Sequence, residues 1–139
     1  MTTIEEHKEI IKEFLEDINE KIRAGLAADR QKIIGFTASE AAANLFALYL
    51  HSKNLLEPTF NINHRFFASL RIAEKKFDIN FNKKEELIKL LVKQEEYRNK
   101  LCYGKKKNSE IVNSAISNLF EIKSIIDNEL EVSDFKLEI

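Results

Sequence analysis

Apolar residues recur at helical spacing near the start of the chain. They lie three, four or seven positions apart and so share one helix face; they are Ile4, Ile11, Leu15, Ile18 and Ile22. Thr3 and Glu6 match a capping box, in which the threonine side chain accepts a hydrogen bond from the first helical turn. The pattern predicts a first helix that begins at Ile4 and ends near Gly25.

The next apolar stretch, from about residue 29 to 53, carries apolar residues on nearly every side. Between Ile33 and Leu50 the only charged residue is Glu40. A helix of this kind is buried on both sides, either inside a bundle or in part by a second subunit. We therefore predict that it is the central helix of the fold.

Two further helices are predicted after an irregular stretch at residues 54–63. We expect a shorter helix over residues 64–77. A longer helix is expected over residues 83–103, with Asn82 as its N-cap and Gly104 at its end.

The fifth predicted helix is capped by Asn108 or Ser109. Apolar residues at helical spacing give it one buried face, formed by Ile111, Ala115, Leu119, Ile122 and Ile126. We predict that residues 1–131 form a single domain and that residues 132–139 form a C-terminal tail.

Composition favours a fold made only of helices. Glycine and proline contribute four of the 139 residues, about 3%, where average usage would give roughly 12%. Sheets need frequent turns, and turns depend on those two residues. Hydrophobic residues at 44% and charged residues at 32% are typical of a soluble globular protein. The sequence predicts an all-α, antiparallel up-and-down bundle of about five helices.

Charge and cysteine content narrow the classes of function. With 22 Lys and Arg against 23 Asp and Glu, the net charge is −1, so only a local basic patch would bind nucleic acid. Cys102 is the only cysteine, which excludes an intramolecular disulfide and fits a reducing compartment. The start of the chain lacks a secretion signal, and no uncharged apolar run is long enough to span a bilayer. We expect a cytoplasmic protein that does not bind membranes.

A charged residue interrupts the buried face of the fourth predicted helix. At 100° per residue, Arg98 continues the apolar stripe of Leu87 and Leu91, together with Gln94. An arginine in that position must be paired, or must face a cleft or a subunit interface, because an unpaired buried charge is very unfavourable. Glu40 is the candidate partner, and the pair is either purely structural or part of a site.

A basic turn follows the fourth helix and would gather positive charge at one end of the bundle. It consists of Lys105, Lys106 and Lys107. Tyr97 and Tyr103 flank the arginine and are able to stack on nucleic-acid bases. The alternative interpretation is a turn whose lysines are only solvated.

The histidines and the cysteine are interpreted as structural or surface residues. His7 and His51 are expected at the surface near helix ends, and His64 is expected to touch solvent in the first turn of the third helix. No histidine pair has metal-ligand spacing, so we predict neither a metal site nor a cofactor. Cys102 is predicted to be a packed thiol.

The segment EYRNKLCYGK, from Glu96 to Lys105, resembles the signature region of HEPN domains. In that family an arginine, often followed by a polar residue, is separated by four to six residues from a histidine. Arg98 matches the arginine and Asn99 the polar residue. The long first helix and the Ala-rich second helix are also similar, so that the resemblance covers about residues 4 to 130. It implies a helical bundle that dimerises and joins two motifs at one cleft.

Many members of that family are metal-independent RNases that act as toxins, commonly encoded beside a nucleotidyltransferase-type antitoxin, and others are non-catalytic modules that bind RNA or nucleotides. The family's histidine has no match here, because Tyr103, Gly104 and Lys105 occupy the three positions where it would stand. Histidine suits proton transfer at neutral pH, whereas tyrosine is a poor base there. A tyrosine still donates hydrogen bonds to phosphate, so the motif favours binding over cleavage.

We therefore predict a homodimeric, non-catalytic module that binds RNA or a nucleotide at a cleft centred on Arg98, with a nucleotidyltransferase-type antitoxin as its implied partner. The predicted binding residues are Arg98, Asn99, Tyr103, Lys105 and Lys106, and Glu40 is the structural partner of Arg98. One alternative is a metal-independent endoribonuclease that uses Arg98 and Tyr103, with His64 as a further candidate. The other is a purely structural helical interaction protein.

Overall fold

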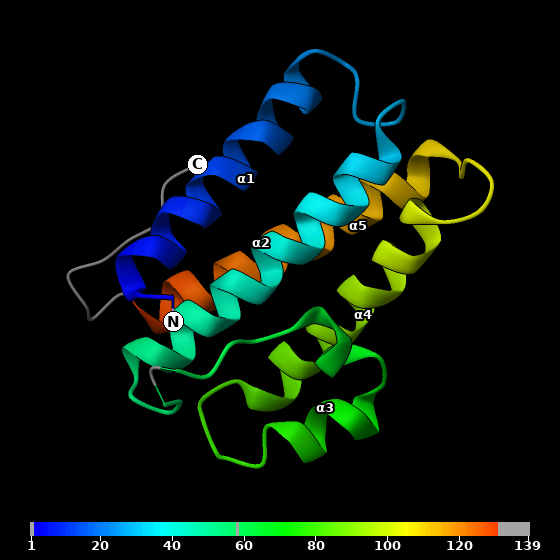
Figure 1. The fold of residues 1–139 in the computed structure, drawn as a ribbon. Coiled ribbons are helices and arrows are strands. Elements are labelled where there is room, and N and C mark those ends of the chain that lie inside the picture. The colour runs from blue at the N-terminus through cyan, green and yellow to red at the C-terminus, as the bar shows by residue number, and fades with distance from the viewer. Residues whose placement is uncertain (1, 58, 131–139) are drawn as a thin grey trace.

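The computed structural model describes residues 2–57 and 59–130, and within these ranges every regular element is a helix (Figure 1). The elements are α1 (Ile4–Arg23), α2 (Gln31–Ser52), the 3-10 turn η1 (His64–Phe67), α3 (Leu70–Lys76), α4 (Lys84–Cys102) and α5 (Ser109–Glu129). The all-helical prediction is confirmed for these residues. The tail predicted at residues 132–139 lies outside them.

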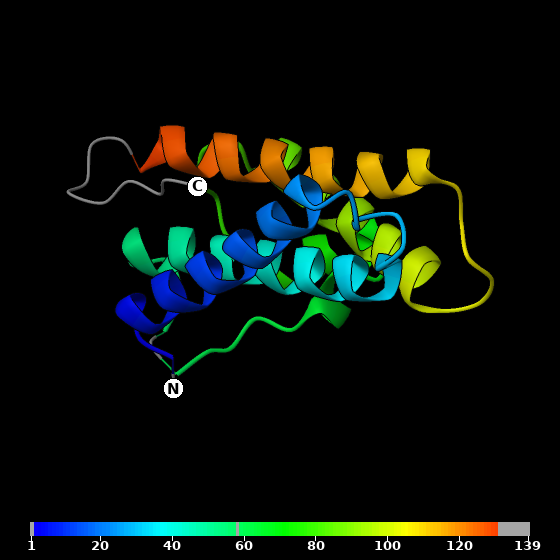
Figure 2. The same cartoon turned by 90° about the horizontal axis from the view of Figure 1, so that it is seen from above.

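Helix α2 lies in the middle of the fold. It packs against α1 on one side and α4 on the other, and Figure 2 shows α5 along a third side. Most of its residues are buried, including Ile34, Leu45 and Phe46. The predicted central helix is confirmed, and its apolar residues point in all directions because three helices cover it.

The close approach of α2 and α4 depends on a glycine. A Cβ added at Gly35 would lie 2.9 Å from the Cβ of Leu101 and 3.1 Å from the Sγ of Cys102. Both distances are shorter than ordinary van der Waals contact between these atoms. A larger residue at this position would therefore push the two helices apart.

The predicted third helix is in fact two short elements. It breaks at Ser69, whose backbone is extended and whose hydroxyl accepts a hydrogen bond from the N–H of Ile72 at 3.1 Å. The break allows Phe67 and Phe77 to stack on each other, with ring centroids 5.6 Å apart, and both rings to pack against Phe46. Burial of these rings overrides the local helical pattern.

The predicted N-cap of α4 was wrong. Helix α4 begins at Lys84 after Lys83, which adopts a left-handed conformation with φ of 63° and makes no side-chain cap. Asn82 instead serves tertiary contacts. Its carbonyl accepts a hydrogen bond from the hydroxyl of Tyr49 at 3.0 Å, and its amide donates to Glu129 at 3.2 Å.

The other predicted helix ends are confirmed. The Thr3 hydroxyl accepts from the Glu6 N–H at 3.1 Å, and the Asn108 side chain accepts from the Ile111 N–H at 3.2 Å. Gly25 and Gly104 follow α1 and α4 with positive φ values of 68° and 76°. Glycine is favoured there because it has no Cβ to collide with the preceding turn.

Helix α2 is the one described helix that is long and apolar enough to cross a membrane by length and composition. Most of it is buried inside this bundle, as is usual for the core helix of a helical domain. Its length and composition are therefore accounted for by the packing of α1, α4 and α5 around it.

Candidate functional site

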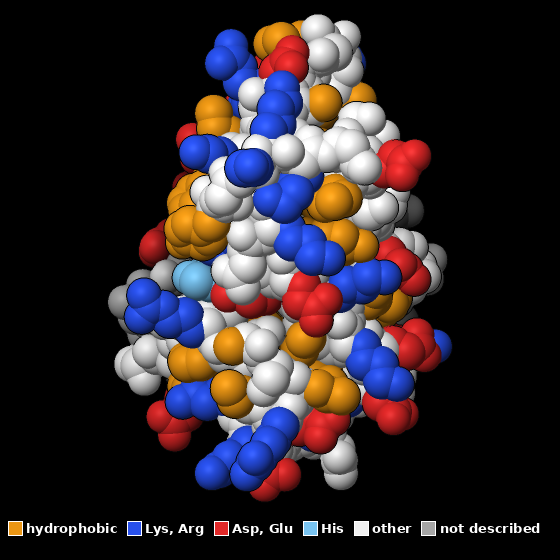
Figure 3. Space-filling view, turned by 90° about the vertical axis from the view of Figure 1, so that its right-hand side faces the viewer, with side chains coloured by type: hydrophobic (Ala, Val, Ile, Leu, Met, Phe, Trp, Pro, Cys, Tyr) orange, Lys and Arg blue, Asp and Glu red, His pale blue; other side chains and the backbone are white. Residues whose placement is uncertain are grey.

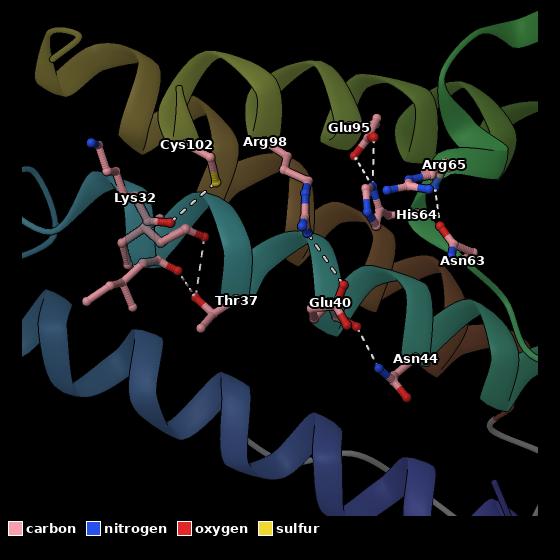
Figure 4. A network of polar contacts seen from close by, with 12 residues as sticks. Lys32, Thr37, Glu40, Asn44, Asn63, His64, Arg65, Glu95, Arg98 and Cys102 are labelled. Atoms are coloured by element: carbon pink, nitrogen blue, oxygen red, sulfur yellow. Dashed lines mark hydrogen bonds and ion pairs between the residues drawn. The ribbon is translucent and has the colours of Figure 1, made fainter. Parts of the chain in front are cut away.

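Arg98 is held between α4 and α2. One guanidinium nitrogen lies 3.4 Å from a carboxylate oxygen of Glu40, and the guanidinium carbon lies 5.2 Å from the ring centre of Phe36 (Figure 4). Only 12% of the Arg98 side chain is exposed, against 31% of Glu40. The structure thus brings together the two charges expected to pair, and a cation–π contact adds to the attraction.

A second charged pair lies one turn earlier on α4. His64 places Nδ1 at 2.8 Å from one carboxylate oxygen of Glu95 and at 3.1 Å from the other. An ionised carboxylate only accepts hydrogen bonds, so Nδ1 carries a proton and donates it to Glu95, and in the neutral form of the ring Nε2 would carry the lone pair. Figure 4 shows this pair beside Arg98, in the space where η1 meets α4.

Glu95 is the participant that the sequence analysis missed. Its side chain is only 7% exposed, although the residue lies in a charged run of α4. On a helical wheel Glu95 lies about 40° beyond Leu91, at the edge of the buried stripe, and that position was the available signal. Sequence spacing alone did not show that His64, 31 residues away, would meet it.

A basic cavity of about 490 Å³ lies where the α1–α2 connection meets the α4–α5 connection. Four of the residues that line it are cations, namely Arg30, Lys32, Lys105 and Lys106. Its lining carboxylate is Asp29, which lies 3.1 Å from Nζ of Lys106. Figure 3 shows Lys and Arg side chains gathered over the upper half of the face that carries α4.

The two connections are joined by a buried glutamine. Gln31, which is 5% exposed, donates hydrogen bonds from Nε2 to the carbonyls of Lys107 at 2.7 Å and Ala28 at 3.0 Å. Its Oε1 accepts from the N–H of Lys107 at 2.8 Å. Both N–H groups of the carboxamide and one lone pair of its oxygen are used in these bonds, so the α4–α5 connection is fastened to the first turn of α2.

The predicted binding residues therefore fall into separate places. Lys105 and Lys106 line the cavity, whereas Arg98 is engaged by Glu40 and Phe36. Asn99 is exposed, and Tyr103 is 65% exposed at the end of α4. Tyr103 follows the last residue of α4 with an extended backbone, whereas Arg98 lies within the helix, so the two side chains do not share a helix face.

The interpretation of His7 as a surface residue was wrong. His7 is buried and stacks on His51, with ring centroids 5.5 Å apart and planes 21° from parallel. Its Nδ1 lies 2.9 Å from the side-chain oxygen of Asn44. Nε2 of each ring is buried without a hydrogen-bond partner. Burial, with a smaller contribution from His51, lowers the pKa of His7 below 6.5.

Cys102 is half-buried, and its thiol lies 3.4 Å from the carbonyl oxygen of Lys32. Burial raises the pKa of this thiol, with a smaller opposing contribution from Arg98. A raised pKa keeps the sulfur protonated, and the thiolate is the reactive form. The structure gives Cys102 the packing expected of an inert thiol between α2 and α4.

No protein-family model, curated protein or solved structure matches this chain. Within residues 2–57 and 59–130, no group of three or more His, Cys, Asp or Glu side chains is placed to hold a metal ion. Functional inference therefore depends on the geometry of the cavity and of the two charged pairs.

Proposed function

We propose that this protein binds a phosphate-bearing ligand, either RNA or a nucleotide, in the basic cavity between α2 and the α4–α5 connection. The observation that carries the proposal is the local imbalance of charge, with four cations around a cavity whose single lining carboxylate is already paired. The whole chain has a net charge of −1, so this concentration of positive charge is a local feature. Clefts lined by one sign of charge attract oppositely charged ligands.

The first turn of α2 supports the same ligand. Arg30 stands at its N-cap and makes no side-chain hydrogen bond to the turn. The N-terminus of a helix carries partial positive charge and unpaired N–H groups, which favours anions. The size of the cavity lies in the range of sites for small ligands, about 300–1,000 Å³.

The proposal departs from the cleft centred on Arg98. That arginine already has a carboxylate and an aromatic ring as partners, so a phosphate would have to compete with Glu40 for it. Lys105 and Lys106 keep the binding role that was predicted for them, and Arg30 and Lys32 join them. Tyr103 remains a candidate for stacking at the rim, since its ring is exposed.

We further propose a HEPN-like protein, an antiparallel up-and-down bundle that acts in the cytoplasm as a homodimer, with a nucleotidyltransferase-type antitoxin as partner. The Arg98–Asn99 motif and the Ala-rich α2 support the likeness. Ile33 and Phe36 remain 46% and 45% exposed on α2, which supports a second copy covering that side.

The test is a titration of fluorescent single-stranded RNA, with free nucleotides as competitors. We expect Lys105→Gln/Lys106→Gln to weaken binding about tenfold or more. Each lost phosphate contact also lowers the slope of log K against log[salt] by about 0.7, so the slope falls by about 1.4. Lys12→Gln/Lys89→Gln removes the same charge from exposed positions elsewhere and is the matched control. Equal binding by the two double variants would refute the proposed cavity.

The His64–Glu95 pair favours one second candidate function, metal-independent RNA cleavage. Nε2 of His64 would take the proton of a 2′-hydroxyl, whose oxygen forms a bond to phosphorus as the bond to the 5′ oxygen breaks. The 5′ oxygen would take up a proton from a water molecule as it leaves, and His64 would later return the 2′-hydroxyl proton to solvent; Arg98 would stabilise the charge on the phosphate.

Incubation of RNA with the protein and a chelator, followed by a denaturing gel, tests this candidate. Cleavage by the wild type that is lost in both His64→Ala and Glu95→Gln would support it. Intact RNA after long incubation with a protein that binds it would reject cleavage and leave the binding function.

A further inference from the structure

We infer that Gln31 is a positioning residue for the proposed ligand, because its carboxamide sets where Lys105 and Lys106 stand in the cavity. The inference rests on the proposed function. It adds an uncharged residue, which acts on ligand binding through the two lysines that it positions. It concerns how the cavity is built from two parts of the chain that are 76 residues apart in sequence.

The carboxamide of Gln31 is buried. Gln31 is 5% exposed, and a buried carboxamide must have partners because leaving them out is unfavourable. The carboxamide of Gln31 has three hydrogen-bond partners, and all three are backbone groups in the α1–α2 and α4–α5 connections. A side chain that held only its own helix would have no need of partners on Lys107.

Gln31 also constrains the conformation of the lysine turn, residues 105–107. Gln31 satisfies both the N–H and the carbonyl of Lys107, so it fixes that peptide from both sides. Lys107 in turn donates from Nζ to the carbonyl of Lys105 at 2.6 Å. The backbone that carries Lys105 and Lys106 is thereby held between Gly104 and the fixed residue.

Lys106 is also paired with Asp29. Its ammonium group lies 3.1 Å from Asp29, and both side chains of this pair are more than half exposed. Exposed ion pairs are weak, so this contact by itself does not hold the turn in place. The buried hydrogen bonds of Gln31 are the stronger constraint on the two lysines.

The experiment compares wild type, Gln31→Met, Lys105→Gln/Lys106→Gln and the triple variant. Methionine is similar in length and apolar, so it fills the buried space and removes all three hydrogen bonds. We expect Gln31→Met to weaken binding of single-stranded RNA by about the same factor as the double lysine variant, tenfold or more. Its slope of log K against log[salt] should also fall by about 1.4.

The triple variant separates positioning from a general structural role. If Gln31 acts through the two lysines, the triple variant binds no more weakly than the double variant. If Gln31 only stabilises the fold, the two effects multiply and the salt slope of Gln31→Met stays at the wild-type value. Either of those last results overturns the inference.

Folding of Gln31→Met is checked by circular dichroism, and a variant that is unfolded in buffer is measured with trimethylamine N-oxide, which favours the compact state. Wild-type affinity and slope in the folded Gln31→Met variant would also overturn the inference, while the proposed function would stand. Failure of the wild type to bind RNA or nucleotide would instead refute the proposed function itself.

Discussion

Two clusters of charge lie along the α2–α4 contact, and they differ in how far their charges are compensated. Around Arg98, each carboxylate has a side-chain partner, with the arginine beside Glu40 and the imidazole of His64 beside Glu95. Around the cavity at the start of α2, four cations share one carboxylate. The first cluster therefore holds helices together, and the second is left with charge that an external anion can satisfy.

The conspicuous Arg98 motif and the proposed binding cavity therefore lie in different places in this fold. Arg98 is conspicuous in the sequence because it interrupts an apolar stripe. In the fold it is paired with Glu40 and contacts the ring of Phe36. Lys105 and Lys106 form a basic turn in the sequence, and the cavity that they line is completed by Arg30 and Lys32 from a distant segment.

The largest effect is expected from a change that disturbs both clusters. Gly35→Ala places a Cβ 2.9 Å from that of Leu101, so α4 must move away from α2. Overpacking of this kind costs about 1–3 kcal/mol, and we expect a value near the upper end. Chemical denaturation measures the loss. Gly25→Ala is the control, since a Cβ there meets nothing within 4 Å and only its positive φ is strained. A loss no greater than that of the control would contradict the close contact.

A smaller effect is expected from Arg98→Ala, which affects the compensated cluster alone. It removes the partner of Glu40 and the cation over Phe36, and we expect a stability loss of about 2 kcal/mol. Glu40 retains some solvent, which keeps the loss below that of stranding a fully buried charge. Ligand affinity should be unchanged when folded protein is titrated. A tenfold loss of affinity without loss of stability would place the ligand-binding site at Arg98 instead of in the basic cavity.

The smallest effect concerns pH and the buried histidine pair, which lies outside both clusters. The pKa of His7 is lowered in the folded state, so the unfolded chain binds more protons below pH 6.5. Stability contributed by neutral His7 is complete above that pH and is lost as the pH falls. Around this ring, Asn44 and Glu6 oppose the shift, while burial and His51 produce it.

Thermal unfolding measured from about pH 7.5 down to about pH 5 tests this effect, because histidine titrates in that range. The midpoint of the wild type should fall a few degrees further than that of His7→Gln, which has no charge to bury. His64→Gln is the control, because it removes a histidine that lies outside the buried pair. Equal shifts in wild type and His7→Gln would contradict the role given to the buried pair.

Much of the fold was predictable because helices are encoded locally. Thr3, Asn108 and the glycines after α1 and α4 mark helix ends by their own backbone and side-chain chemistry. The errors came where tertiary contacts override local preference. Asn82 bonds to Tyr49 and Glu129 instead of capping α4, and Phe67 and Phe77 break the third helix so that both rings become buried.

Periodicity and an isolated charge act over one or two helical turns, so an all-helical fold, a central α2 and the need for a partner at Arg98 could be predicted from local patterns. Which charges are compensated depends on the packing of the helices. That packing joins Gln31 to Lys107, Arg30 and Lys32 to Lys105 and Lys106, and His64 to Glu95. Pairings between residues so far apart depend on how the helices pack, and helical spacing carries no information about them.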